Sequence, residues 1–236
     1  MAYFRRYDYP TPDPAILARL TEQQREMQQR IIIQKPDFDL KLIAGCDSSF
    51  IGEDTILSAF ILLSYPDLEV IEKVWHHDTV ELPYIPGFLA FREAPNLLKA
   101  YEKLQQKPDL IMVDGHGISH PRRLGIATHL GLHLNKPTMG VAKKVLVGKY
   151  KEPDLTKGSI SPLEYKGEVI GNVIRTKDNV KPVFVSPGHL MDLESATEIA
   201  LACATKYKLP EPTRLADHYA AVFKSEVNQD LQDGEG

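Results

Sequence analysis

The sequence predicts an α/β domain built on one mixed central sheet that is flanked by helices. Its 236 residues are 43% hydrophobic, which is enough to form one large core. Near the N-terminal end, three strand-like segments follow one another across short turns, which is typical of an antiparallel meander. Beyond them, strand-like and helical segments alternate, which is typical of parallel strands connected by helices. Together these observations favour a sheet with an antiparallel part and a parallel part.

The first half of the chain supplies a helix, the meander and a second helix. The first helix is expected over residues 14–30, because Asp13 and Pro14 are typical of a capped first turn. The strands of the meander are expected at Leu40–Cys46, Ile56–Tyr65 and Leu68–Leu82, with turns at 51–54 and 66–67. The second helix begins near Pro86, and Pro95 either kinks it or starts a further helix.

The second half supplies the alternating elements and then two closing helices. These elements are expected as a strand at 109–113, a helix at Leu124–Leu134, a strand at Pro137–Val141, a hairpin of Val169–Thr176 with Val183–Ser186, and helices at Met191–Thr205 and Pro212–Phe223. No repeat or linker interrupts the chain, so residues 1–225 are expected to form one domain. Residues 226–236 are acidic and poor in apolar residues, which predicts a disordered tail.

This order of elements is that of a ribonuclease H-like fold. A doubly wound fold is the alternative, but it would lack the opening meander. The ribonuclease H-like architecture places carboxylates on the first strand, the first helix after the meander, the end of the fourth strand and a late helix. The chain has acidic residues at all of these places, namely Asp47, Glu93, Asp114 and Asp217.

Two of these carboxylates suggest a metal site. Asp114 lies in the glycine-flanked segment 113–117 after a buried strand, where α/β proteins bind ligands, and Asp47 ends a second apolar run. Oxygen ligands without a cluster of His and Cys select Mg²⁺ or Mn²⁺ rather than zinc. With Glu93 or Asp217 the site could hold a second ion. Lys143, just after a strand, could place a cation near a scissile phosphate.

A short loop precedes the second helix and carries two prolines. Pro83 and Pro86 stiffen this loop, which would present Tyr84 and Ile85 between them. Taken alone, such a segment is a buried connector. Beside a nuclease cleft, a stiff apolar loop can act as a wedge that unstacks bases.

The histidines fall into two groups. His120 shares a loop with Asp114 and could contact phosphate, and Arg122 adds positive charge there. His129 and His133 are four residues apart on a predicted helix but lack the motif of a helical metal site, so structural or exposed roles are favoured.

Five blocks of sequence resemble the endonuclease V family, over roughly residues 40–220. These blocks are Pro83–Glu93, Val113–Gly117, His120–Gly125, Gly140–Lys144 and Pro210–Ala216. The resemblance implies a Mg²⁺-dependent nuclease, with Mn²⁺ as a substitute, that recognises deaminated adenine (inosine) in nucleic acid. It also implies hydrolysis of the second phosphodiester bond 3′ to the lesion, which leaves 3′-hydroxyl and 5′-phosphate ends.

The resemblance also implies roles for individual residues. Asp47, Glu93 and Asp114 match the metal-binding carboxylates, and Lys143 matches the catalytic lysine. Asp217 is carried over as a catalytic carboxylate without a ligand role, because some members have His at this helix position. The segment 83–86 matches the strand-separating wedge. The positions that match the pocket for the flipped base are Gly87, Leu89, Gly115 and Leu146.

The charge, the cysteine content and the hydropathy of the sequence limit which partners and which cellular compartment are expected. The net charge of −4 hides a basic middle, because residues 114–181 hold twelve Lys and Arg against six Asp and Glu. Two distant cysteines in apolar runs predict buried free thiols and a cytoplasmic protein, and no run is long enough for a membrane. A monomer that acts on inosine-containing DNA is expected, with RNA left open. A junction-resolving nuclease and a non-cleaving nucleic-acid-binding protein are the alternatives.

Overall fold

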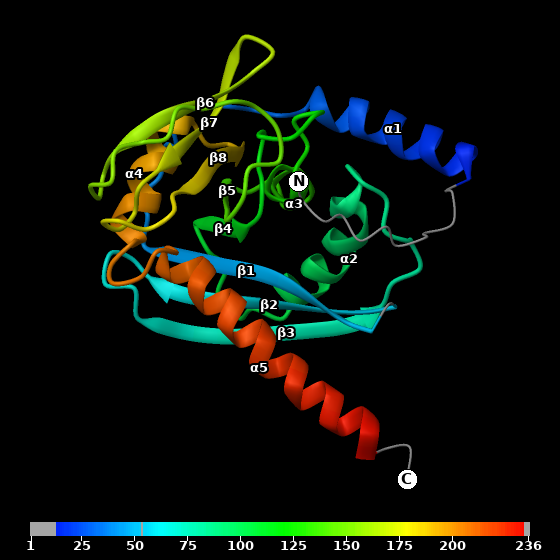
Figure 1. Cartoon of the computed structure of the whole chain (residues 1–236). Helices are drawn as coiled ribbons and strands as arrows, with labels where there is room; N and C mark the ends of the chain where they lie inside the picture. The colour runs from blue at the N-terminus through cyan, green and yellow to red at the C-terminus, as the bar shows by residue number, and fades with distance from the viewer. Residues whose placement is uncertain (1–12, 53, 234–236) are drawn as a thin grey trace.

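An eight-stranded mixed sheet forms the centre of the molecule, in the strand order β3-β2-β1-β4-β5-β8-β7-β6 (Figure 1). The computed structural model describes residues 13–52 and 54–233. The strands are β1 (Leu42–Ile51), β2 (Thr55–Ser64), β3 (Val70–Thr79), β4 (Leu110–Asp114), β5 (Thr138–Ala142), β6 (Ile160–Tyr165), β7 (Glu168–Ile174) and β8 (Val183–His189). The helices are α1 (Pro14–Gln28), α2 (Leu89–Glu102), α3 (Ile126–Leu134), α4 (Leu193–Cys203) and α5 (Glu211–Asp233).

The sheet has the two predicted parts. Strands β1, β2 and β3 form the antiparallel meander, whereas β1, β4 and β5 run parallel to one another. Strand β8 returns antiparallel to β5 and continues the sheet into β7 and β6. The predicted mixed sheet is therefore confirmed, and its parallel strands lie at its centre. Within the described ranges, no helix is both long and apolar enough to cross a membrane.

Helices cover both faces of the sheet because the strand side chains alternate between two cores. On β1, Ala44 and Cys46 belong to the core under α2 and α3. Ile43, from the same strand, belongs to the opposite core, which α4 and α5 cover. Both cysteines are buried free thiols, as predicted.

Two elements differ from the predictions in the middle of the chain. Helix α2 runs unbroken through Pro95, since Ala94 and Leu97 on either side pack into the same core. The expectation that a second helix starts at Pro95 is therefore wrong. Strand β6 was not predicted, because Pro162 interrupts its pattern. Strand β6 lies at the edge of the sheet, with β7 as its neighbouring strand, and a proline is tolerated there.

The C-terminal helix is longer than predicted. Residues 226–236 were expected to be a disordered tail, but α5 continues to Asp233, and residues 234–236 lie outside the described residues. Ala220 and Val227 are buried against Leu57 and Ala59 of β2. This apolar stripe holds the acidic segment on the sheet, so composition alone was a poor guide here.

Candidate active site

The parallel pairing of β1 with β4 brings two carboxylates to one edge of the sheet. Cys46 and Val113 are partners in this pairing, so the next residues, Asp47 and Asp114, emerge side by side. Both side chains lie on the face that α5 covers, because their neighbours in the strands point to the other core. The sequence predicted this adjacency from the strand ends.

Helix α5 brings a third carboxylate to this pair. One ligand oxygen each from Asp47, Asp114 and Asp217 can be chosen so that all lie within 4.8 Å of one another. Gly45 makes this approach possible, since a Cβ there would lie 1.8 Å from the backbone oxygen of Pro212 in α5. We call these three residues the acidic trio.

Lys143 joins the acidic trio from the end of β5. Its Nζ lies 2.6 Å from Oδ2 of Asp114 and 3.0 Å from Oδ1 of Asp217. Burial disfavours the charged ammonium group, but the two carboxylates outweigh burial and raise the pKa of Lys143 above its ordinary value. The lysine therefore stays positively charged beside the carboxylates.

The site carries more buried acidic groups than one lysine can neutralise. Burial, and then the charge of Asp114, raise the pKa of Asp47 to about 8. The same two causes raise the pKa of Glu93, on α2, to about 8. Such groups favour a bound cation, and a donor set made only of oxygen suits Mg²⁺ or Mn²⁺. Glu93 is outside the acidic trio, which includes Asp217 instead, within the part of the chain that the structure describes.

A cavity of about 220 Å³ adjoins the carboxylates. Asp47, Glu93 and Asp114 line this cavity together with Tyr84 and His120. All of the residues predicted for a base pocket line it as well, namely Gly87, Leu89, Gly115 and Leu146. The other residues that line it were not predicted as pocket residues; they are Ala90, His116, Leu124, Gly125 and Ile126. They lie in α2 or in the segment from β4 into α3, close in sequence to predicted positions, and that proximity was the available signal.

The loop after Asp114 is fixed from β8. The backbone N–H of Gly117 donates to the Ser186 hydroxyl at 2.9 Å, and the Ser119 and Ser186 hydroxyls are 2.8 Å apart. Nδ1 of His116 lies 2.8 Å from the Ser119 hydroxyl. Ser186 is fully buried in this network, so its hydroxyl supports the loop.

The segment 83–86 differs in one respect from its predicted form. Tyr84 is 37% exposed and lines the cavity, whereas Ile85 is only 5% exposed. Ile85 packs with Leu20 of α1 and with Phe88. The expectation that Ile85 is presented together with Tyr84 is therefore wrong, because burial of an isoleucine side chain is worth about 1.5–3 kcal/mol.

The two predicted phosphate contacts bond within the protein in this structure. Nδ1 of His120, a buried residue, accepts a hydrogen bond from the backbone N–H of Arg122 at 3.2 Å. The Arg122 guanidinium donates to the backbone oxygen of Gly87 at 2.7 Å and to the side-chain oxygen of Gln24. Burial lowers the pKa of His120 to about 4, so it is neutral at physiological pH.

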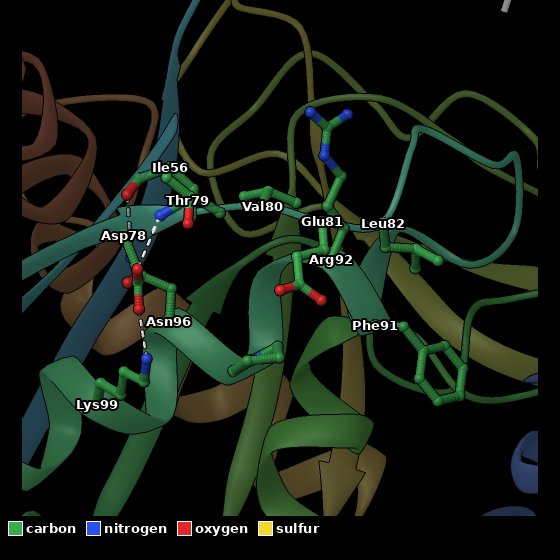
Figure 2. Close-up of a pocket in the computed structure, with 11 residues that line it drawn as sticks. Ile56, Asp78, Thr79, Val80, Glu81, Leu82, Phe91, Arg92, Asn96 and Lys99 are labelled. Atoms are coloured by element: carbon green, nitrogen blue, oxygen red, sulfur yellow. Dashed lines mark hydrogen bonds and ion pairs between the residues drawn. The ribbon is translucent and has the colours of Figure 1, made fainter. Parts of the chain in front are cut away.

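A second cavity, of about 360 Å³, lies on the other side of α2 (Figure 2). Figure 2 shows the ion pair of Asp78 with Lys99 at one end and Phe91 at the other. The buried amide of Asn96 donates to the backbone oxygen of His76 and to the Ser58 hydroxyl, each at 2.9 Å. These contacts tie the end of β3 to α2 just before the segment 83–86.

Comparison with known proteins identifies the family. The sequence model of endonuclease V matches residues 25–218 of this chain. The chain belongs to the endonuclease V family. Membership of this family implies a nuclease, in agreement with the resemblance seen in the sequence.

Similar proteins agree in sequence and in structure. Endonuclease V of Dictyoglomus turgidum is 49% identical over 205 residues, which cover 86% of this chain and 90% of that protein. The crystal structure of the Streptomyces avermitilis endonuclease V has a TM-score of 0.86 at 36% identity, covering 94% and 96% of the two chains. The Ciona intestinalis endonuclease V, in complex with a 24mer DNA containing an inosine followed by a ribo-adenosine, has a TM-score of 0.79 at 27% identity, covering 90% and 99%.

Proposed function

We propose that this protein is a Mg²⁺-dependent endonuclease that recognises inosine in DNA. It hydrolyses the second phosphodiester bond 3′ to the lesion, leaves 3′-hydroxyl and 5′-phosphate ends, and acts as a monomer in the cytoplasm. The observation that carries the proposal is the cavity that joins a glycine-containing wall to buried carboxylates. The Ciona relative bound to inosine-containing DNA supports this substrate class.

The cavity offers the chemistry needed to read a flipped base. Hypoxanthine differs from adenine by a carbonyl group and an N1–H, which backbone groups can distinguish. Gly87 and Gly115 let the backbone approach such a base, while Leu89 and Leu146 supply apolar contact. Flipping costs a few kcal/mol and least where pairing is already weak, which favours a lesion over a normal base.

The acidic trio and Lys143 supply the chemistry of cleavage. Asp47 and Asp114, with Asp217 or Glu93, would hold Mg²⁺, for which Mn²⁺ is a chemically similar substitute. When bound, the ion activates water and neutralises charge on the phosphodiester. Lys143, held by Asp114 and Asp217, keeps a positive charge at the site and stabilises the negative charge that develops on the phosphate.

The segment 83–86 acts as the wedge that parts the strands. Pro83, Tyr84 and Pro86 are exposed, and Tyr84 lines the cavity that would receive the flipped base, so its ring would lie next to the gap that this base leaves in the duplex. Ile85 anchors the loop instead of touching the nucleic acid. His120 and Arg122 remain candidates for phosphate contacts, on condition that Arg122 exchanges a protein partner for phosphate.

Cleavage of matched oligonucleotides tests the proposal. Single-stranded and duplex DNA with one inosine, the same sequences with adenine, and their RNA counterparts are incubated with Mg²⁺, with Mn²⁺ or with EDTA. We expect a single cut with either metal in the inosine strands and none with EDTA. An Asp114→Ala variant serves as the inactive control. Stronger cleavage of a four-way junction without inosine would favour a junction-resolving nuclease, and binding without any cleavage would favour a non-cleaving protein.

A further inference from the structure

Helix α1 buries a polar side chain that the proposed chemistry does not use. Most of this helix is exposed, and its buried residues are Leu20 and Gln24. Burying a glutamine amide is costly unless its donor and acceptor atoms are both hydrogen-bonded. Here Nε2 of Gln24 donates to the backbone oxygen of Gly87 at 3.0 Å, and Oε1 accepts from Nε of Arg122. The amide is thus bonded on both sides.

These contacts close a triangle around Gly87. Nη2 of Arg122 donates to the same backbone oxygen of Gly87, at 2.7 Å, so Gln24 and Arg122 both bond to this oxygen. The guanidinium also lies over the ring of Phe88, with 4.5 Å between its central carbon and the ring centroid. Gly87 has φ +81°, and a Cβ there would lie 2.8 Å from Nη2 of Arg122. The triangle therefore suits glycine alone at this position.

The triangle completes the attachment of the loop that lines the cavity. On the β3 side, Asp78 and Asn96 tie the chain to α2 (Figure 2). On the α2 side, Gln24 and Arg122 hold Gly87, and Ile85 packs on α1. Gln24 itself is not among the residues that line the cavity. It can influence that wall only through Gly87 and the neighbouring Tyr84 and Leu89.

We propose that Gln24 is a positioning residue that sets base specificity by fixing Gly87 at the wall of the cavity. This inference rests on the proposed function, because it assumes that the cavity receives the flipped base. A wall held within a few tenths of an ångström can discriminate one base from another, whereas a loosened wall accepts both more equally. Gln24 bonds to Gly87 and Arg122 rather than to the acidic trio or Lys143, so the chemical step at saturation should be preserved.

Binding and cleavage by a Gln24→Met variant test the proposal. Methionine keeps the volume of the side chain but removes both hydrogen bonds. Dissociation constants are measured in EDTA for oligonucleotides that differ only by inosine or adenine, and KM and kcat are measured with Mg²⁺. We expect the inosine preference to fall about tenfold, as loss of one or two hydrogen bonds allows, with kcat unchanged within about twofold. Gln28→Met, at an exposed position at the end of α1, is the matched control and should behave like wild type.

Two further variants separate positioning from stability. Gln24→Glu keeps the acceptor for Arg122 but places a carboxylate oxygen against the backbone oxygen of Gly87, so it should lose the inosine preference at least as fully as Gln24→Met. Combining Gln24→Met with Arg122→Lys should cost less than the sum of the single effects, because both act on one carbonyl. The proposal is overturned if the inosine preference of Gln24→Met equals that of wild type, or if kcat and thermal stability fall together while the preference is kept. A wild-type protein without any inosine preference would instead refute the proposed function.

Discussion

At the scale of single residues, the site depends on which face of the sheet each carboxylate approaches. The sequence predicted that Asp47 and Asp114 meet, because strand ends define a common edge. From the residues alone, either Glu93 or Asp217 could add to this pair, and the family resemblance implied Glu93 as the third metal ligand. The structure places Asp217 in the acidic trio and Glu93 outside it, on the helix over the other face of the sheet. The rotation of α2 and α5 about their axes decides this, and periodicity fixes such a rotation only to within a residue or so.

Asp47→Asn is expected to abolish cleavage without unfolding the protein. The change removes a carboxylate from the acidic trio but keeps its volume. Activity with Mg²⁺ should fall by more than the roughly 10–100-fold that loss of an outer partner of a metal ligand costs. The melting temperature of the metal-free protein should not fall, because two buried carboxylates no longer face each other. Turnover near the wild-type level would exclude Asp47 as a ligand.

Burial of His129 leads us to predict that folding stability depends on pH, independently of the candidate active site. Burial, and then neighbouring His133, lower the pKa of His129 to about 3, and Arg30 acts on His133 in turn. The unfolded chain, with a pKa near 6.5, therefore binds the proton first, and stability is lost as the pH falls from about 6.5 toward 3. At pH 5 this group alone costs about 2 kcal/mol.

A His129→Leu variant checks this dependence by urea unfolding at pH 7 and pH 5. The loss of unfolding free energy between the two pH values should be smaller than in wild type by about 2 kcal/mol. His133→Leu, at a more exposed position on the same helix, should change the loss much less. Equal losses in wild type and His129→Leu would contradict the buried neutral histidine.

At the scale of elements, the loop between β3 and α2 shows what sequence can and cannot predict. Its stiffness followed from Pro83 and Pro86. Which of Tyr84 and Ile85 is buried could not be predicted, because it depends on α1, a helix distant in sequence. The role of Arg122 was hidden for the same reason, since its partners Gln24 and Gly87 lie 98 and 35 residues away. Strand β6, by contrast, was missed locally, through its proline.

Tyr84→Ala should weaken recognition of inosine most strongly in duplex DNA. Stacking of a base on an aromatic ring is worth roughly 1–3 kcal/mol, so affinity should fall about one to two decades. The loss should be smaller for a single strand, which needs no parting. Binding to both substrates and the melting temperature are measured, with Tyr150→Ala, equally exposed at 37% but outside the cavity, as the control. An unchanged ratio of duplex to single-strand binding would exclude a role of the segment 83–86 as a wedge.

At the scale of the whole molecule, the parallel strands at the centre of the sheet position the other elements and the candidate site. The order of elements predicted this arrangement, and with it most of the candidate site. The length of α5 was not predictable from composition, because its acidic end is held by a few buried contacts such as Val227. Close packing of α5 on β1, through Gly45, is likewise a property of the assembled fold.

Gly45→Ala is expected to disturb both stability and the site. The added Cβ would meet the backbone of Pro212, which cannot move without shifting α5. Overpacking of this kind costs about 1–3 kcal/mol or more. The midpoint of urea unfolding should fall, and the folded fraction should need more Mg²⁺ for half-maximal cleavage, since Asp217 moves away from its partners. A variant with wild-type stability and metal dependence would show that α5 adapts freely.

The acidic trio also links cleavage to complete folding, because its three carboxylates come together only when the whole chain has folded. Asp47 comes from the first strand, whereas Asp217 comes from the last helix, some 170 residues later. During synthesis, the growing chain passes through a long stage in which the first two carboxylates are present and the third is not. If Asp217 completes the metal site, as proposed, the chain stays inactive until α5 has emerged and docked. Stalled and truncated chains that lack α5 remain in that state.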